Sequence, residues 1–137
     1  MTLLHDHLDG GIRPGTLLEL ADAVGHPLPA GSPDSLSRWF VEAASSGSLT
    51  SYLQTFEHAC AVTQTTEALY RIACEAVEDV AADGVSAAEF RFAPTQHVTD
   101  LSIDEVVEAV LGGLSDAGSS TGVRAGLILG AVRPAYD

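Results

Sequence analysis

Three short apolar segments, separated by longer amphipathic ones, constrain the fold of this chain most strongly. The first begins at Leu3-Leu4, the second covers residues 85–92 and the third covers residues 123–132. The third is an almost unbroken apolar run, which is typical of a strand in a parallel sheet covered on both faces. The order strand, helices, strand, helix, strand predicts an α/β fold.

The segment between the first two predicted strands contains more helices than a simple β–α–β unit needs. Pro14 suits the first turn of a helix and Gly25 suits its end, and a loop with three prolines follows at residues 26–35. A further helix before the third strand has a predicted buried face, formed by Ile103, Val106, Val107, Val110, Leu111 and Leu114. The predicted helices cover residues 14–24, 36–44, 50–62, 66–82 and 100–118.

The composition excludes several classes of partner. The chain has 137 residues, enough for one domain, and six basic against nineteen acidic residues give a formal net charge of −13. This balance argues against binding to nucleic acid or to an anionic membrane. No basic leader and no long apolar run is present, and Cys60 and Cys74 have no CxxC spacing, so they are expected to be buried thiols. We expect one cytoplasmic domain over residues 1–137.

Two histidines near the start suggest a metal site. His5 and His7 are two residues apart at the end of the first predicted strand. Because strand side chains alternate between faces, His5, His7 and Asp9 are expected on one side. Imidazole nitrogens are good ligands for zinc and other divalent ions, so we predict that His5 and His7 bind a metal beside Asp9. On spacing alone, an ordinary pair of exposed or hydrogen-bonded core histidines remains an alternative.

Three motifs resemble the adenosine deaminase family, and together they extend over the whole chain. They are His5-Asp6-His7-Leu8-Asp9-Gly10 with Arg13-Pro14, then Leu49-x-x-Tyr52-Leu53-x-x-Phe56, then Glu89-Phe90-Arg91-Phe92-Ala93-Pro94. The resemblance implies the N-terminal part of a (β/α)8 TIM barrel, with about three strands and extra helices at the catalytic mouth. A complete barrel has eight strands and about 250 residues, so the domain is expected to be truncated.

The resemblance also implies an activity and several site residues. The activity is zinc-dependent hydrolytic deamination of adenosine or deoxyadenosine, with one Zn²⁺ per site held by His5 and His7. His7 would also approach the substrate, and Asp9 would hydrogen-bond the nucleoside sugar. The family places an apolar helix face over the nucleoside, although helical spacing alone favours core packing for the same residues, which are Leu49, Tyr52, Leu53 and Phe56.

Other parts of the family's catalytic machinery have no match in these residues. The family's acid/base Glu and its later metal ligands lie in His-Ala-Gly-Glu and Asp-Asp-Pro motifs, and neither occurs here. We therefore expect no useful turnover from the 137 residues alone. Two alternatives remain open: a deaminase of adenine or another 6-aminopurine, and a non-catalytic binding fragment. An exposed sheet edge would favour association of such a fragment.

The remaining polar residues are predicted to have structural roles. Glu89 and Arg91 share one face of the second strand, and two inward charges are costly unless paired, so a polar network is expected there. Asp6 is expected to point away from the metal. Three histidines without supporting spacing are predicted to lie in loops or on helix surfaces: His26, His58 and His97.

Overall fold

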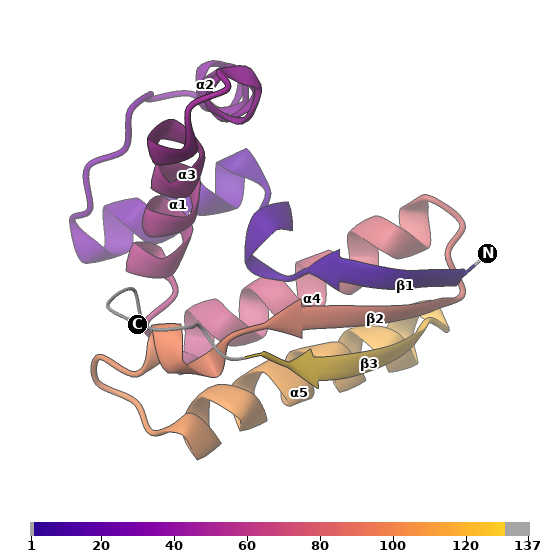
Figure 1. Ribbon diagram of the computed structural model, residues 1–137. Helices are drawn as coiled ribbons and strands as arrows, with labels where there is room; N and C mark the ends of the chain where they lie inside the picture. The colour runs from indigo at the N-terminus through magenta and orange to yellow at the C-terminus, as the bar shows by residue number, and fades with distance from the viewer. Residues whose placement is uncertain (1, 131–137) are drawn as a thin grey trace.

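The computed structural model describes the backbone of residues 2–130, and the side chains of residues 2–5 and 9 lie outside the described part. Three parallel strands form one sheet in the order β1-β2-β3 (Figure 1). They are β1 (Thr2–His7), β2 (Ala87–Phe92) and β3 (Arg124–Leu129). The predicted α/β arrangement with a parallel sheet is confirmed. The last two residues of the predicted third strand, 131 and 132, lie outside the described residues.

Five α-helices and two short 3-10 helices complete the described fold. Helix α2 begins at Pro33, inside the predicted loop, because Ser32 and Ser35 form a reciprocal capping box and proline suits the first helical turn. The helices are α1 (Pro14–Val24), α2 (Pro33–Ser45), α3 (Leu49–Val62), α4 (Thr66–Ala82), α5 (Ile103–Thr121), η1 (Asp9–Gly11) and η2 (Pro94–His97). Among the described helices, none is long and apolar enough to cross a membrane.

Helices α4 and α5 cover one face of the sheet and form the main core with it (Figure 1). Strand β2 alternates as predicted, with Ala88, Phe90 and Phe92 buried and the residues between them half-buried. The six residues of β3 are only half-buried or exposed, so the expected cover on both faces is wrong for this strand. The reason is that α4 and α5 lie on the same side of the sheet.

Helix α5 buries only part of its predicted face: Val106, Val110 and Leu114 are buried as predicted. Ile103 and Leu111 are 47% and 46% exposed, contrary to the prediction. The buried face also includes Gly113 and Ala117, because α5 approaches the backbone of α4 very closely at Gly113. This buried face consists of Val106, Val110, Gly113, Leu114 and Ala117.

Helices α1, α2 and α3 gather beyond the carboxyl ends of the strands, where the arrowheads point in Figure 1. We call these three helices the helical cap. They have a small core of their own, formed by Leu17, Ala21, Leu36 and Val62. The extra helices between β1 and β2 therefore lie at the end of the sheet where barrel enzymes place their active sites.

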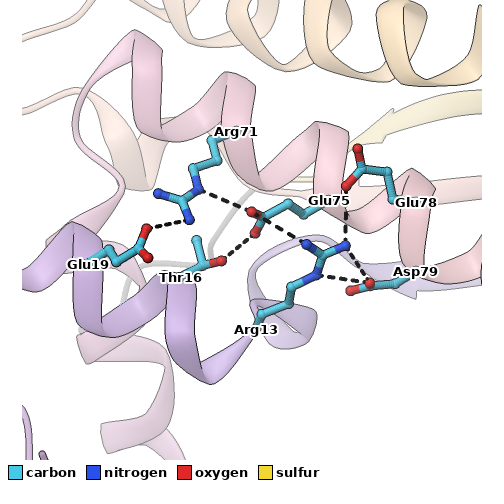
Figure 2. Close-up of polar contacts among 7 residues, drawn as sticks. All are labelled: Arg13, Thr16, Glu19, Arg71, Glu75, Glu78 and Asp79. Atoms are coloured by element: carbon cyan, nitrogen blue, oxygen red, sulfur yellow. Dashed lines mark hydrogen bonds and ion pairs between the residues drawn. The ribbon is translucent and has the colours of Figure 1, made fainter. Parts of the chain in front are cut away.

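A cluster of charged side chains attaches α1 to α4 (Figure 2). Arg13 donates two hydrogen bonds to Asp79, at 3.0 and 2.7 Å, and these bonds raise the pKa of the Arg13 guanidinium. Glu75 lies at the centre, where it accepts hydrogen bonds from Thr16 at 2.5 Å and from Arg71 at 3.1 Å. The cluster holds the first helix of the cap against the main core.

Glu75→Gln is expected to lower the free energy of unfolding by about 1 kcal/mol, because glutamine cannot form ion pairs with Arg13 and Arg71 and has one acceptor oxygen instead of two. The side chain of Glu75 is only 14% exposed, whereas that of Glu78 is 51% exposed. Glu78→Gln is the matched control, with an expected change below about 0.5 kcal/mol. Urea unfolding followed by circular dichroism measures both, and equal losses in the two variants would contradict the central role of Glu75.

Candidate active site

One row of side chains crosses the sheet near its carboxyl end. His7 of β1 is in register with Arg91 of β2, and Arg91 is in register with Ile128 of β3. All three residues line one cavity of about 380 Å³. Just beyond the strand, the Leu8 N–H donates a hydrogen bond to the Arg91 carbonyl at 2.9 Å, which fixes the backbone on both sides of His7. We call this cavity the sheet cavity.

The pairing of β1 with β2 is irregular just before His7. Leu3 pairs with Ala88 and Asp6 pairs with Phe90, so β1 has one residue more than β2 between these pairs. Such bulges are frequent next to active sites. The strand ends at His7 and Asp9 lies in η1, so strand alternation does not extend to Asp9. The side chains of His5 and Asp9 lie outside the described residues, and their predicted roles remain predictions.

The helical cap contributes two aromatic residues of α3 to the wall of the sheet cavity. Tyr52 and Phe56 line this cavity and contact each other edge to face, with ring centroids 5.2 Å apart. They also line a second cavity of about 380 Å³ between α1, α2 and α3. Leu49 and Leu53 are 71% and 49% exposed and line neither cavity. The core packing that helical spacing favours for this face is therefore wrong, since the face is turned away from both cores.

A hydrogen-bonded junction connects the end of α3 with η2, which contributes Gln96 to the lining of the sheet cavity. The Nδ1 atom of His97 is 2.9 Å from the Thr63 carbonyl and 3.1 Å from its hydroxyl. The Gln64 side chain donates to the Gln96 carbonyl at 2.8 Å, and Gln96 lines the sheet cavity. His97 is only 1% exposed, so its predicted surface position is wrong. Its partners are 34 residues away in sequence, which no local pattern indicates.

Arg91 brings a positive charge to the sheet cavity. Glu89 and Arg91 share the half-buried face of β2 as predicted, but no hydrogen bond or ion pair joins them among the described residues. The buried Nε of Arg91 has no hydrogen-bond partner there. The predicted polar network is therefore absent from the described part of the chain. A buried donor of this kind suits an oxygen acceptor from a ligand or from another segment.

The described residues fit a divalent metal only in part. His7 lines the sheet cavity, and a neutral imidazole is a common ligand for zinc and related ions. No group of three His, Cys, Asp or Glu side chains that could hold a metal occurs within the described residues. The donor type on this wall is therefore suitable, and a complete metal site would need ligands in addition to His7.

The two cysteines are not part of the candidate site. Cys60 and Cys74 are half-buried free thiols, so the expected burial is only partial. The Cys74 thiol donates a hydrogen bond to the Gly113 carbonyl of α5 at 3.4 Å, and burial raises its pKa. The Cys60 thiol donates a hydrogen bond to the Gln96 side chain of η2 at 3.5 Å, so each thiol bonds to a neighbouring segment.

Comparisons with known proteins agree with this geometry. A family model described as adenosine deaminase matches residues 1–136. The adenosine deaminase of Mycobacteroides abscessus is 56% identical over 116 residues, which are 83% of this chain and 32% of that protein. The chain thus spans about a third of the length of the curated relatives it matches.

Two solved structures show the same arrangement of strands and helices. The adenine deaminase of Arthrobacter aurescens superposes with a TM-score of 0.79 at 27% identity, over 93% of this chain and 38% of that one. A zinc-bound amidohydrolase of Burkholderia ambifaria gives a TM-score of 0.76 at 28% identity, over 93% of this chain and 34% of that one. The parallel sheet and its helices correspond to part of a TIM barrel, and the chain belongs to the adenosine deaminase family.

Proposed function

We propose that this chain forms the N-terminal portion of a barrel hydrolase that deaminates adenosine or deoxyadenosine, releasing ammonia. The observation that carries the proposal is the convergence of His7, Arg91 and the rings of Tyr52 and Phe56 on one cavity. This cavity lies at the carboxyl ends of parallel strands, where active sites of TIM barrels are found. The membership of the chain in the adenosine deaminase family supports the type of reaction.

The aromatic wall is proposed to bind the purine base. Tyr52 and Phe56 of the cap and Ile128 of the sheet provide apolar surface to the sheet cavity. A volume of about 380 Å³ suits a small ligand, and such pockets combine apolar walls with a few polar groups. Gln96 and Arg91 supply hydrogen-bond donors at the cavity wall. Leu49 and Leu53 would extend the apolar face over the nucleoside, and Asp9 would accept a hydrogen bond from its sugar.

A zinc ion is the proposed cofactor, held by His5 and His7 together with ligands from the remainder of the protein. When bound, such an ion lowers the pKa of water and so supplies a nucleophile at neutral pH. The contribution of this chain is to orient the imidazole of His7, because strand pairing and the Leu8 hydrogen bond fix its backbone. The acid/base Glu is proposed to come from outside these 137 residues.

A second candidate substrate is adenine or another 6-aminopurine. The superposition with the adenine deaminase of Arthrobacter aurescens favours this candidate. The two substrates differ in the sugar, so Asp9→Ala is expected to distinguish them. Loss of adenosine binding with retention of adenine binding in this variant would support the nucleoside.

Zinc binding and purine binding by the chain test the proposed function. We expect calorimetry to detect Zn²⁺ binding that His5→Ala and His7→Ala each weaken by about 100-fold or more, since even second-shell partners contribute 10–100-fold. His26→Gln is the matched control, because it removes an imidazole outside the sheet cavity. With zinc present, adenosine is expected to shift the ring proton signals of Tyr52 and Phe56.

Three outcomes would contradict parts of the proposal. Unchanged zinc affinity in both alanine variants would exclude the histidine pair as ligands. Adenosine-induced shifts confined to residues outside the sheet cavity would exclude the aromatic wall as the base site. Zinc-dependent formation of inosine by the 137 residues alone would show that they contain their own acid/base group.

A further inference from the structure

A histidine pair joins two elements of the helical cap outside the sheet cavity. The Nε2 atom of His26, which follows the end of α1, lies 2.9 Å from the Nδ1 atom of His58 in α3. The two rings meet edge to face with centroids 5.2 Å apart. The ring of Trp39 in α2 contacts His58, with centroids 5.4 Å apart. All three parts of the cap therefore meet at His58, which the sequence pattern places on a helix surface.

We propose that His26 and His58 form a proton-sensitive latch that holds α3 in the helical cap and releases it when both imidazoles are protonated. The latch would act on the sheet cavity through α3, since that helix carries Tyr52 and Phe56. The proposal concerns the folded chain itself and is independent of the substrate.

The hydrogen-bonding capacity of imidazole explains why the second proton is decisive. In a neutral pair, one ring donates its N–H and the other accepts it. After one proton binds, the imidazolium still donates to the neutral ring. After a second proton binds, both facing nitrogens are donors, and two positive charges face each other across the contact. The hydrogen bond is then replaced by a repulsion.

The surroundings of His58 resist its protonation. Burial lowers the pKa of His58 below its ordinary value of 6.5, and the neighbouring His26 lowers it further. Glu57 opposes this shift, and α2 contributes the uncharged ring of Trp39. A histidine whose pKa is lower in the closed form stabilises that form fully above pH 6.5. This stabilisation is lost as the pH falls through the pKa of the closed form, so the latch opens in mild acid.

The anchoring of α3 determines which part of it would move. Its C-terminal end is attached to η2 by the bonds of Thr63 and Gln64. The latch at His58 lies just before this anchor. Release is therefore expected to free the N-terminal part of α3, where Tyr52 and Phe56 form the cavity wall.

Hydrogen exchange and fluorescence test the latch between pH 7.5 and 5.5. We expect amide exchange in α3, corrected for intrinsic rates, to increase several-fold as the pH falls, while exchange in α4 stays unchanged. Trp39 is the only tryptophan of the chain, and its emission should fall as the adjacent His58 becomes charged. The C2–H signal of His58 should titrate with a midpoint below 6.5.

A non-titrating pair of side chains provides the decisive variant. His58→Asn keeps an acceptor oxygen near the position of Nδ1, and His26→Gln keeps an amide donor near Nε2. The double variant H26Q/H58N is expected to keep α3 protected at pH 5.5. Gln54→Asn, on the exposed side of α3, controls for the lower helix propensity of asparagine and should retain the pH response.

Three results would overturn the latch. The first is α3 exchange in the original chain that does not change between pH 7.5 and 5.5. The second is an equal pH response in H26Q/H58N, which would assign the response to other groups. The third is a His58 midpoint at or above 6.5, which would mean that the cap favours the charged ring.

Discussion

Phe90→Ala is expected to lower the free energy of unfolding by about 3–5 kcal/mol, the usual cost of truncating a buried phenylalanine. Phe90 lies at the middle of the sheet on β2 and is 0% exposed, in the core that β2 forms with α4 and α5. Removal of its ring leaves a cavity that the surrounding strands and helices can fill only partly. Because small domains have a stability of about 5–15 kcal/mol, this loss would be a large share of the total.

The matched control is an aromatic residue outside the core. Tyr52 is 44% exposed, so Tyr52→Ala is expected to change stability by less than about 1 kcal/mol. Urea unfolding followed by circular dichroism at pH 7.5 measures both variants. Similar midpoints for Phe90→Ala and the original chain would mean that the core of β2 is less tightly packed than the structure indicates.

Gly113→Ala is expected to destabilise the fold by about 2–3 kcal/mol, as for other overpacked interiors. A Cβ atom at this position would lie 2.5 Å from the Tyr70 carbonyl oxygen and 2.7 Å from the Ala73 Cβ. Both neighbours belong to α4, and one of them is backbone, so the two helices must separate to accommodate the methyl group. The hydrogen bond from Tyr70 to Asp116, at 2.5 Å, joins the same two helices and would be strained by this separation.

Gly112→Ala is the control because it makes the same change one position earlier. Its added Cβ would be 3.7 Å from the nearest atom, an ordinary contact with the Tyr70 ring. Alanine favours helix over glycine by about 1 kcal/mol, so this variant should be unchanged or more stable. The changes in the free energy of unfolding are therefore expected to have opposite signs in the two variants. A Gly113→Ala variant that is more stable than the original chain would contradict the close helix contact.

The strands and most helix boundaries could be predicted because their signals are local. The alternation of polar and apolar residues identifies β2. Helix α1 begins at Pro14 and ends before Gly25, and both residues are typical of these positions. The start of α2 at Pro33 differs from the predicted loop, and the cap that explains it is Ser32 beside the proline. A proline at the first helical turn and a proline in a loop look alike until the capping residue is considered.

The candidate site could be predicted only in part. The His7 position and the Tyr52–Phe56 face were identified from motifs, and the structure brings these residues to one cavity. Gln96 was missed, and its junction with Gln64 links segments 32 residues apart in sequence. The His26–His58 contact is likewise 32 residues apart, and neither residue belongs to a motif. Contacts of this kind depend on how whole helices pack, which local periodicity does not encode.

By itself, the sequence determined the α/β class, the parallel sheet, the family and the residue types at the candidate site. These properties depend on hydrophobic period, helix caps and short motifs, all of which act over a few residues. Only the tertiary structure decided that Ile103 and Leu111 of α5 are exposed while Gly113 is buried, how the cap lies over the sheet cavity and which histidines meet. Those outcomes depend on the approach of entire elements, such as the close contact of α5 with α4 that places Gly113, rather than Leu111, against the core.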